Sequence, residues 1–161
     1  MKSIRNKLVY LFALFPIVST GLYLAVMASS TTEDFSFGAA AIIGFLAVTA
    51  AWGFVGALFA RTRHLLVPSA AIAHILPILT TVAYTVLYIV SQFTESSELE
   101  DLAILIGGLG TGFFGVLGTF LYALIPLSLF EVYINFMFSV LVFIIGFAIG
   151  ASRQPVKKTK K

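Results

Sequence analysis

A few polar side chains within long apolar runs carry whatever chemistry this chain could perform. His74, Thr81, Thr85 and Tyr88 follow one another at intervals of seven, four and three residues, which places them on one helix face. Glu131 is the only carboxylate within apolar sequence. An ionisable group inside a bilayer is costly and indicates a functional site by default. One hypothesis is that Glu131 and His74 form a proton-sensitive pair. Another is that the hydroxyls of the third helix line a path for water or a binding face. The simpler interpretation is that these polar groups form hydrogen bonds between helices.

Catalysis needs converging groups, such as a nucleophile with a base, paired carboxylates or a set of metal ligands. The apolar sequence offers His74, Glu131 and scattered hydroxyls, and the chain has no cysteine and only two histidines. We therefore predict no enzyme activity, no metal site and no cofactor. A Gly-x-Gly-x-x-Gly pattern at residues 110–115 lacks the preceding strand and βαβ unit that a nucleotide site requires.

The elements that position these residues are long apolar segments. Of the 161 residues, 60% are hydrophobic and 11% are charged, and the mean hydropathy is +1.05. A helix of ~20 apolar residues crosses the ~30 Å hydrocarbon layer of a bilayer. The sequence therefore predicts an all-α integral membrane protein, a single membrane domain of about five transmembrane helices. The expected helices cover 8–28, 37–60, 67–90, 102–125 and 130–151, and a basic tail covers 152–161.

Prolines and polar clusters mark the expected breaks. Pro77 should kink the third helix, because proline removes a backbone hydrogen bond inside a helix. Pro126 should separate the last two helices, and the acidic stretches 29–36 and 91–101 should form loops. The basic start and the end of the first run at Ala28 also resemble a secretory signal, but the apolar run exceeds the usual ~7–15 residues.

The charges predict a topology but leave one question open. Lys and Arg near span ends favour the cytoplasm, so the amino terminus and the Arg61/Arg63 loop are expected on the cytoplasmic side of the plasma membrane. Five spans would place the tail outside and divide the ten basic residues equally between the two sides. Five spans agree with the segment lengths, whereas four spans plus a re-entrant Gly-rich segment is the alternative. Charges confined to ends and loops do not suggest nucleic-acid binding.

Small residues at helical spacing predict close helix packing, because they let backbones approach. Three sets stand out in the second, fourth and last helices: Gly44 with Ala40, Ala47 and Ala51; Gly108, Gly112 and Gly115 with Thr119; and Gly146 with Gly150. Gly53 and Ala57 form another such pair. The Gly-x-x-x-Gly pattern favours a homo-oligomer or a partner membrane protein, besides contact with lipid. For the Gly-rich fourth helix, the alternative is an unwound segment that binds a solute.

Two functions follow as hypotheses. The first is a non-catalytic accessory, regulatory or protective subunit that acts through helix contacts, and it predicts an exposed groove of small residues. The second is a small-solute or ion transporter or channel that uses the Gly-rich fourth helix and the polar face of the third. It predicts a polar cavity beside those two helices.

Overall fold

The computed structural model describes residues 9–21, 35–62, 65–112 and 131–153, and within these ranges the regular structure is all helical. The elements in chain order are η1 (Val9–Leu14), α3 (Phe35–Ala60), α4 (Leu66–Ala73), α5 (Ile75–Thr94), α6 (Ser97–Thr111) and α8 (Glu131–Ser152). The 3₁₀ helix η1 continues as α-helix to Gly21, and we call residues 9–21 the amino-terminal helix. Gly115, Thr119, the predicted turn at Pro126 and most of the predicted tail lie outside the described residues.

In the described part of the chain, three helices are long and apolar enough to cross a membrane, over Ile42–Ala60, Ile75–Thr94 and Glu131–Ser152. The second and fifth predicted helices are found as α3 and α8, within two residues of the expected bounds. Both are continuous apolar runs without an internal proline, so nothing interrupts their backbone hydrogen bonds. The helical fold class is therefore confirmed for the described part of the chain.

The third predicted helix is divided in two at His74, which separates α4 from α5. Pro77 has no N–H to donate to the carbonyl of Ala73, and its ring crowds that carbonyl. His74 accordingly leaves helical geometry, with φ −102° and ψ 14°. The backbone bond from Ile78 N–H to the carbonyl of His74 (2.8 Å) then restarts the helix. The expected kink is present, but the break lies three residues before the proline.

The predicted acidic loop 91–101 is wrong in extent, because most of it is helical. Helix α5 continues to Thr94, and α6 begins at Ser97. Glu95 turns the chain in a left-handed conformation with φ 52°, and the Ser96 hydroxyl caps α6 by accepting from Leu99 N–H at 3.4 Å. Glu98 and Glu100 lie in the first turn of α6, where negative charge favours the helix dipole. The sequence relates Glu100 and Asp101 to the start of a helix expected at Leu102, and the structure begins that helix five residues earlier, at Ser97.

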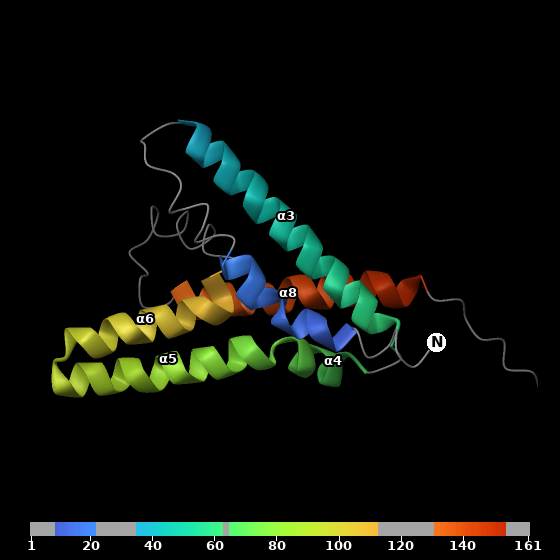
Figure 1. Cartoon of the computed structure of the whole chain (residues 1–161). Coiled ribbons are helices and arrows are strands. Elements are labelled where there is room, and N and C mark those ends of the chain that lie inside the picture. Colours follow the sequence, from blue (N-terminus) through green and yellow to red (C-terminus); the bar gives the residue numbers. More distant parts are fainter. Residues whose placement is uncertain (1–8, 22–34, 63–64, 113–130, 154–161) are drawn as a thin grey trace, which may run out of the picture.

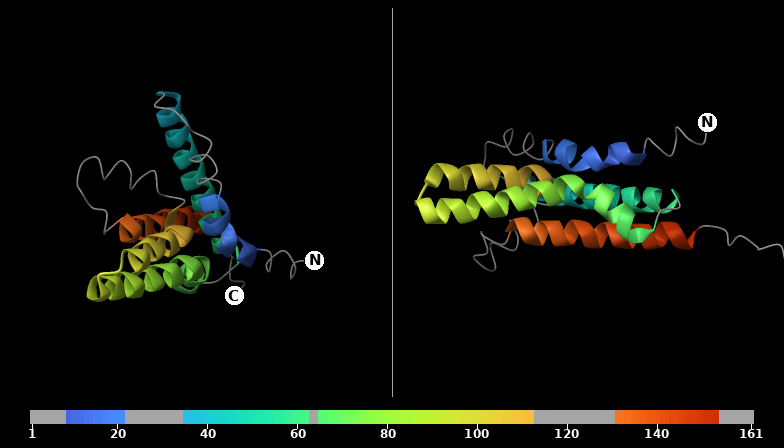
Figure 2. Two further views of the ribbon diagram at one scale, coloured as in Figure 1. Left: turned by 60° about the vertical axis from the view of Figure 1, so that its left-hand side comes forward. Right: turned by 90° about the horizontal axis from the view of Figure 1, so that it is seen from below.

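Helices α3 and α8 run parallel to each other. Three contacts show this direction, because the residue numbers rise along both helices in the same order. They are the Phe45–Phe138 ring pair, the Trp52–Ser139 hydrogen bond and the contact of Ala57 with Gly150. Helix α5 runs antiparallel to α8, because Thr85 bonds Tyr133 whereas the His74 ring meets Phe143. The views in Figures 1 and 2 show this arrangement. The carboxyl-terminal ends of α3 and α8 therefore lie at the same end of the bundle, which we call the Arg61 end.

The opposite end, which we call the Glu95 end, holds the tight turn between α5 and α6. The amino-terminal helix starts at the Arg61 end, because Tyr10 contacts Phe59 and Phe15 stacks on Trp52. Helix α8 starts on the Glu95 side, since Val132 reaches the level of Gly107 and Tyr84.

Helix α6 stops before it reaches the Arg61 end. It lies antiparallel on α5, with Gly107 against Tyr84 and Gly110 against Pro77 and Thr80. Pro77 is eleven residues, or about 16 Å of helix, from the start of α4 at Leu66. Helices α6 and α8 therefore both begin on the Glu95 side of the bundle, at Ser97 and Glu131.

Candidate functional site

The crossing of α3 and α8 is built from small residues. A Cβ on Gly146 would overlap the carbonyl oxygen of Gly53 and lie 2.8 Å from its Cα. A Cβ on Gly150 would lie 2.6 Å from the Cα of Ala57. Side chains at these positions would hold the two backbones apart, so the close approach requires glycine in α8. The predicted Gly146/Gly150 and Gly53/Ala57 pairs thus meet each other within one chain.

Gly56 extends the same contact toward Phe143, because a Cβ there would collide with the carbonyl of that residue. Phe143 is fully buried and belongs to a cluster with Trp52, Val55, Phe59 and Ala73. The Trp52 indole N–H donates to the carbonyl of Ser139 at 2.9 Å. This bond satisfies the only polar atom of the tryptophan side chain inside an otherwise apolar cluster.

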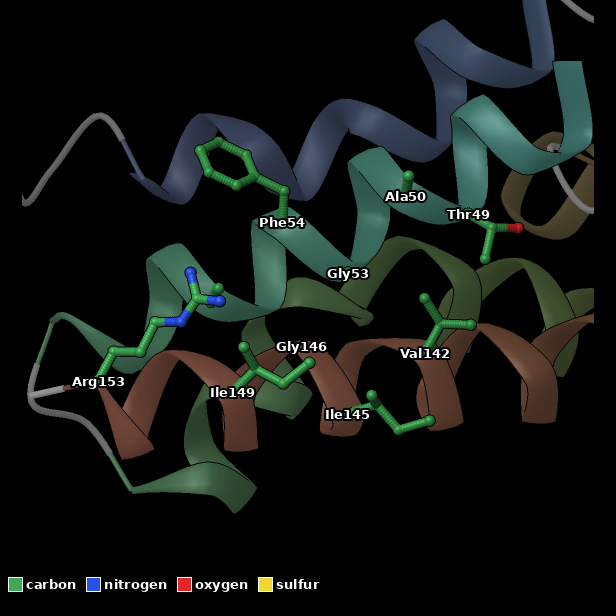
Figure 3. A pocket seen from close by; sticks show the side chains of 10 residues that line it. Thr49, Ala50, Gly53, Phe54, Val142, Ile145, Gly146, Ile149 and Arg153 are labelled. Atoms are coloured by element: carbon green, nitrogen blue, oxygen red, sulfur yellow. The ribbon is translucent and has the colours of Figure 1, made fainter. Parts of the chain in front are cut away.

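A groove of about 410 Å³ follows this crossing on the outside of the bundle, as Figure 3 shows. Its α3 wall is formed by Thr49, Ala50, Gly53, Phe54 and Ala57. Its α8 wall is formed by Val142, Ile145, Gly146, Ile149 and Arg153. The walls are apolar except for Thr49 near one end and Arg153 at the Arg61 end. An exposed groove of small residues was expected under the accessory-subunit hypothesis, but its place between α3 and α8 was not, because the sequence does not indicate which two helices meet.

His74 lies at the centre of the described core and is only 1% exposed. Its ring is in edge contact with Trp52, Phe136 and Phe143, with centroid distances of 5.3, 6.1 and 5.3 Å. Its Nδ1 lies 2.9 Å from the carbonyl oxygen of Ala70, and its Nε2 has no partner among the described residues. The ring is thus held by aromatic edges and a single backbone bond.

The structure does not bring Glu131 to His74. Glu131 interacts through a side-chain hydrogen bond with Asn135, one turn further along α8. It starts α8 on the Glu95 side, whereas His74 lies beside Phe143 in the middle of that helix. The expected contact assumed that α8 begins at the same end of the bundle as the third predicted helix, and the parallel pairing of α3 with α8 reverses that direction.

The hydroxyl face of α5 packs against its neighbours. The Thr85 hydroxyl is 2.7 Å from the Tyr133 hydroxyl of α8 and also donates to the carbonyl of Thr81 at 2.8 Å. Tyr88 stacks on Tyr84 with ring centroids 5.8 Å apart. Thr81 is buried, and its Oγ1 has no partner among the described residues. The structure therefore brings Thr81, Thr85 and Tyr88 to one interface near the start of α8, where Glu131 lies, whereas His74 packs against Phe143 further along that helix.

The glycines of α6 contact α5 through a different face from the predicted one. Gly107 and Gly110 make the contact, whereas a Cβ on Gly108 would meet no atom within 4 Å. Gly112 lies beside the amino-terminal helix, where its Cβ would be 3.1 Å from Cγ2 of Thr20. The sequence could not distinguish these faces, because glycine occupies both. In α3, Gly44 likewise has open space around its Cβ position.

Buried side-chain oxygen atoms without a partner occur on several helices. Within the described ranges they are the Oγ1 of Thr20, Thr49 and Thr81, the Oγ of Ser69 and the Oδ1 of Asn135. Asn135 was passed over in the sequence, although it is the only amide side chain within the apolar run of α8. No group of three or more His, Cys, Asp or Glu residues converges among the described residues.

No protein-family model, curated protein or solved structure matches the chain.

Proposed function

We propose that this chain is an integral membrane protein with four crossings and one re-entrant segment. The four crossings would be formed by the amino-terminal helix together with the apolar sequence that follows it to residue 28, by α3, by α4 with α5, and by α8. Large apolar side chains face outward on all of the long helices, for example Ile43, Leu79 and Met137, which are 61–67% exposed. The re-entrant element would be α6, because it begins on the same side of the bundle as α8 and ends within the bundle.

The charge distribution supports this topology over five spans. With α8 parallel to α3, all ten basic residues belong to the Arg61 end or to the chain segments that adjoin it: Lys2, Arg5, Lys7, Arg61, Arg63, Arg153, Lys157, Lys158, Lys160 and Lys161. All seven acidic residues belong to the other side: Glu33, Asp34, Glu95, Glu98, Glu100, Asp101 and Glu131. Because Lys and Arg prefer the cytoplasm, the amino terminus and the tail would both lie on the cytoplasmic side of the plasma membrane.

Within the membrane, we propose a non-catalytic accessory or regulatory subunit that acts through helix contacts. The observation that carries this is the amino-terminal half of α3, which diverges from the other described helices (Figures 1 and 2). Gly44 has no atom within 4 Å of its Cβ position, and Ala47 on the same face is exposed. In lipid, small residues drive helix association by allowing close backbone contact. This face is therefore available to a helix of a partner protein.

A photo-crosslinking amino acid at Ala47, introduced in the cells that make this protein, tests the proposal. We expect a discrete protein adduct, because a partner helix would lie within contact distance of this face. The same amino acid at Leu79, an exposed position of α5, is the control and should react only with lipid. Gly44→Leu should remove the Ala47 adduct. Equal adducts at both positions, or none at Ala47, would contradict a specific partner.

Transport is a second hypothesis, favoured by the end of α6 inside the bundle. Half-helices that end within a membrane expose carbonyls that can coordinate cations, and the unpartnered hydroxyl of Thr20 lies at this end. Gly107 and Gly110, however, pack α6 tightly on α5 and fill the space where a polar cavity was expected. Cation flux into vesicles that contain the protein, reduced by Thr20→Val, is expected only under this hypothesis.

A further inference from the structure

The groove between α3 and α8 extends along both helices. Its α8 wall runs from Val142 to Arg153, which is eleven residues or about 16 Å of helix. This length is about half of the ~30 Å hydrocarbon thickness of a bilayer, which is the depth of one leaflet. The groove therefore matches the length of one acyl chain within a single leaflet.

The groove is deep because the residues along its floor have small side chains or none. Gly53 on α3 meets Gly146 on α8, so part of the floor is the backbone crossing itself, and Ala50 and Ala57 continue this line of small residues along α3. Larger side chains, such as Phe54 and Ile149, form the rims. An apolar chain in this groove would contact backbone and side-chain atoms on several sides, which gains dispersion energy over contact with a flat helix surface.

Arg153 gives the groove a polar end. It follows α8 directly, is exposed, and forms no ion pair with any described residue. Figure 3 shows its side chain pointing from the end of α8 toward α3, across this end of the groove. A guanidinium binds phosphate through two parallel N–H···O bonds. An apolar trough that ends at one guanidinium complements a molecule with a hydrocarbon tail and a phosphate head.

We propose that this groove binds one acyl chain of an anionic phospholipid from the leaflet at the Arg61 end, with the lipid phosphate on Arg153. This inference rests on the proposed membrane placement. The basic run from Lys157 to Lys161 follows Arg153 in the sequence and adds positive charge on the same side of the membrane. Anionic lipids gather near such segments, which raises their local concentration at the mouth of the groove.

The test uses the full chain in nanodiscs of an equimolar mixture of phosphatidylcholine and phosphatidylglycerol, followed by native mass spectrometry of the released protein. We expect one retained phosphatidylglycerol per chain in preference to phosphatidylcholine. Arg153→Gln should lower this retention about fivefold, as the loss of ~1 kcal/mol for one basic side chain near a membrane implies. Ala50→Leu should displace the lipid, because the added side chain fills the groove.

Two matched controls separate the groove from general effects. Arg61→Gln removes one charge at the same end but outside the groove, and Ala71→Leu adds the same bulk on the exposed face of α4. Both should retain the lipid as the unmodified protein does. Equal losses in Arg153→Gln and Arg61→Gln, equal retention of the two lipids, or a second copy of the chain in place of lipid would each overturn the inference. A protein that does not enter nanodiscs would instead overturn the membrane placement itself.

Discussion

A cysteine at position 161 is expected to react from the same side of the membrane as a cysteine at position 62. The chain contains no cysteine, so Lys161→Cys, Thr62→Cys and Glu95→Cys each provide a single labelling site without further changes. The parallel pairing of α3 and α8 places the ends of both helices at the Arg61 end, and Glu95 lies at the other end. A membrane-impermeant maleimide should therefore label position 95 in intact cells, and positions 62 and 161 only after permeabilisation.

The result is all or none, because a labelled position is either accessible or shielded by the bilayer. Five complete spans would place position 161 with position 95, and both would react in intact cells. That outcome would contradict four crossings with a re-entrant segment. Labelling of all three positions in intact cells would indicate leaky membranes, and the labelling of a cytoplasmic marker protein in the same cells controls for this.

Gly146→Ala should destabilise the protein by about 1–3 kcal/mol, the cost of forcing extra volume into a packed site. The new methyl group would overlap the carbonyl oxygen of Gly53 and lie 2.6 Å from its carbon, so the two helix backbones must separate. Both contacts are backbone atoms, which cannot rotate away as a side chain could. The change should be measured as the free energy of unfolding in mixed detergent micelles.

Trp52 offers a built-in probe for this measurement. It is the only tryptophan of the chain, it is buried, and its indole bonds Ser139 across the same helix pair. Gly44→Ala and Gly108→Ala are matched controls, because the same methyl group meets no atom within 4 Å at either position. They should leave stability unchanged or raise it by up to ~1 kcal/mol through helix propensity. If Gly146→Ala unfolds like Gly44→Ala, the close α3–α8 contact is wrong.

The sequence predicted the positions of the helices better than it predicted which helices contact one another. Hydropathy located α3 and α8 within two residues, because each is one apolar run between polar ends. The small pairs Gly53/Ala57 and Gly146/Gly150 were also recognised, but spacing along one helix does not identify the helix that faces it. Their contact with each other, and the groove beside it, required the structure.

The directions of the helices and the faces through which they pack could not be predicted for similar reasons. Counting charges for five spans gives a tie, whereas the proposed four crossings would put all basic residues on one side. The start of α6 at Ser97 was missed because Glu98 and Glu100 were assigned to a loop, although they suit a helix amino terminus. His74 was recognised as an unusual residue within an apolar run, but its aromatic surroundings come from α3 and α8, far away in the chain.

The separation of α3 from α8 in the chain also has a consequence for synthesis. The Trp52–Ser139 bond joins residues 87 positions apart. At a translation rate of ~5–20 residues per second, α3 emerges roughly 4–17 s before its partner. During this interval its glycine face and its tryptophan N–H lack their partners from α8, and the bundle can close only after the last helix has left the ribosome.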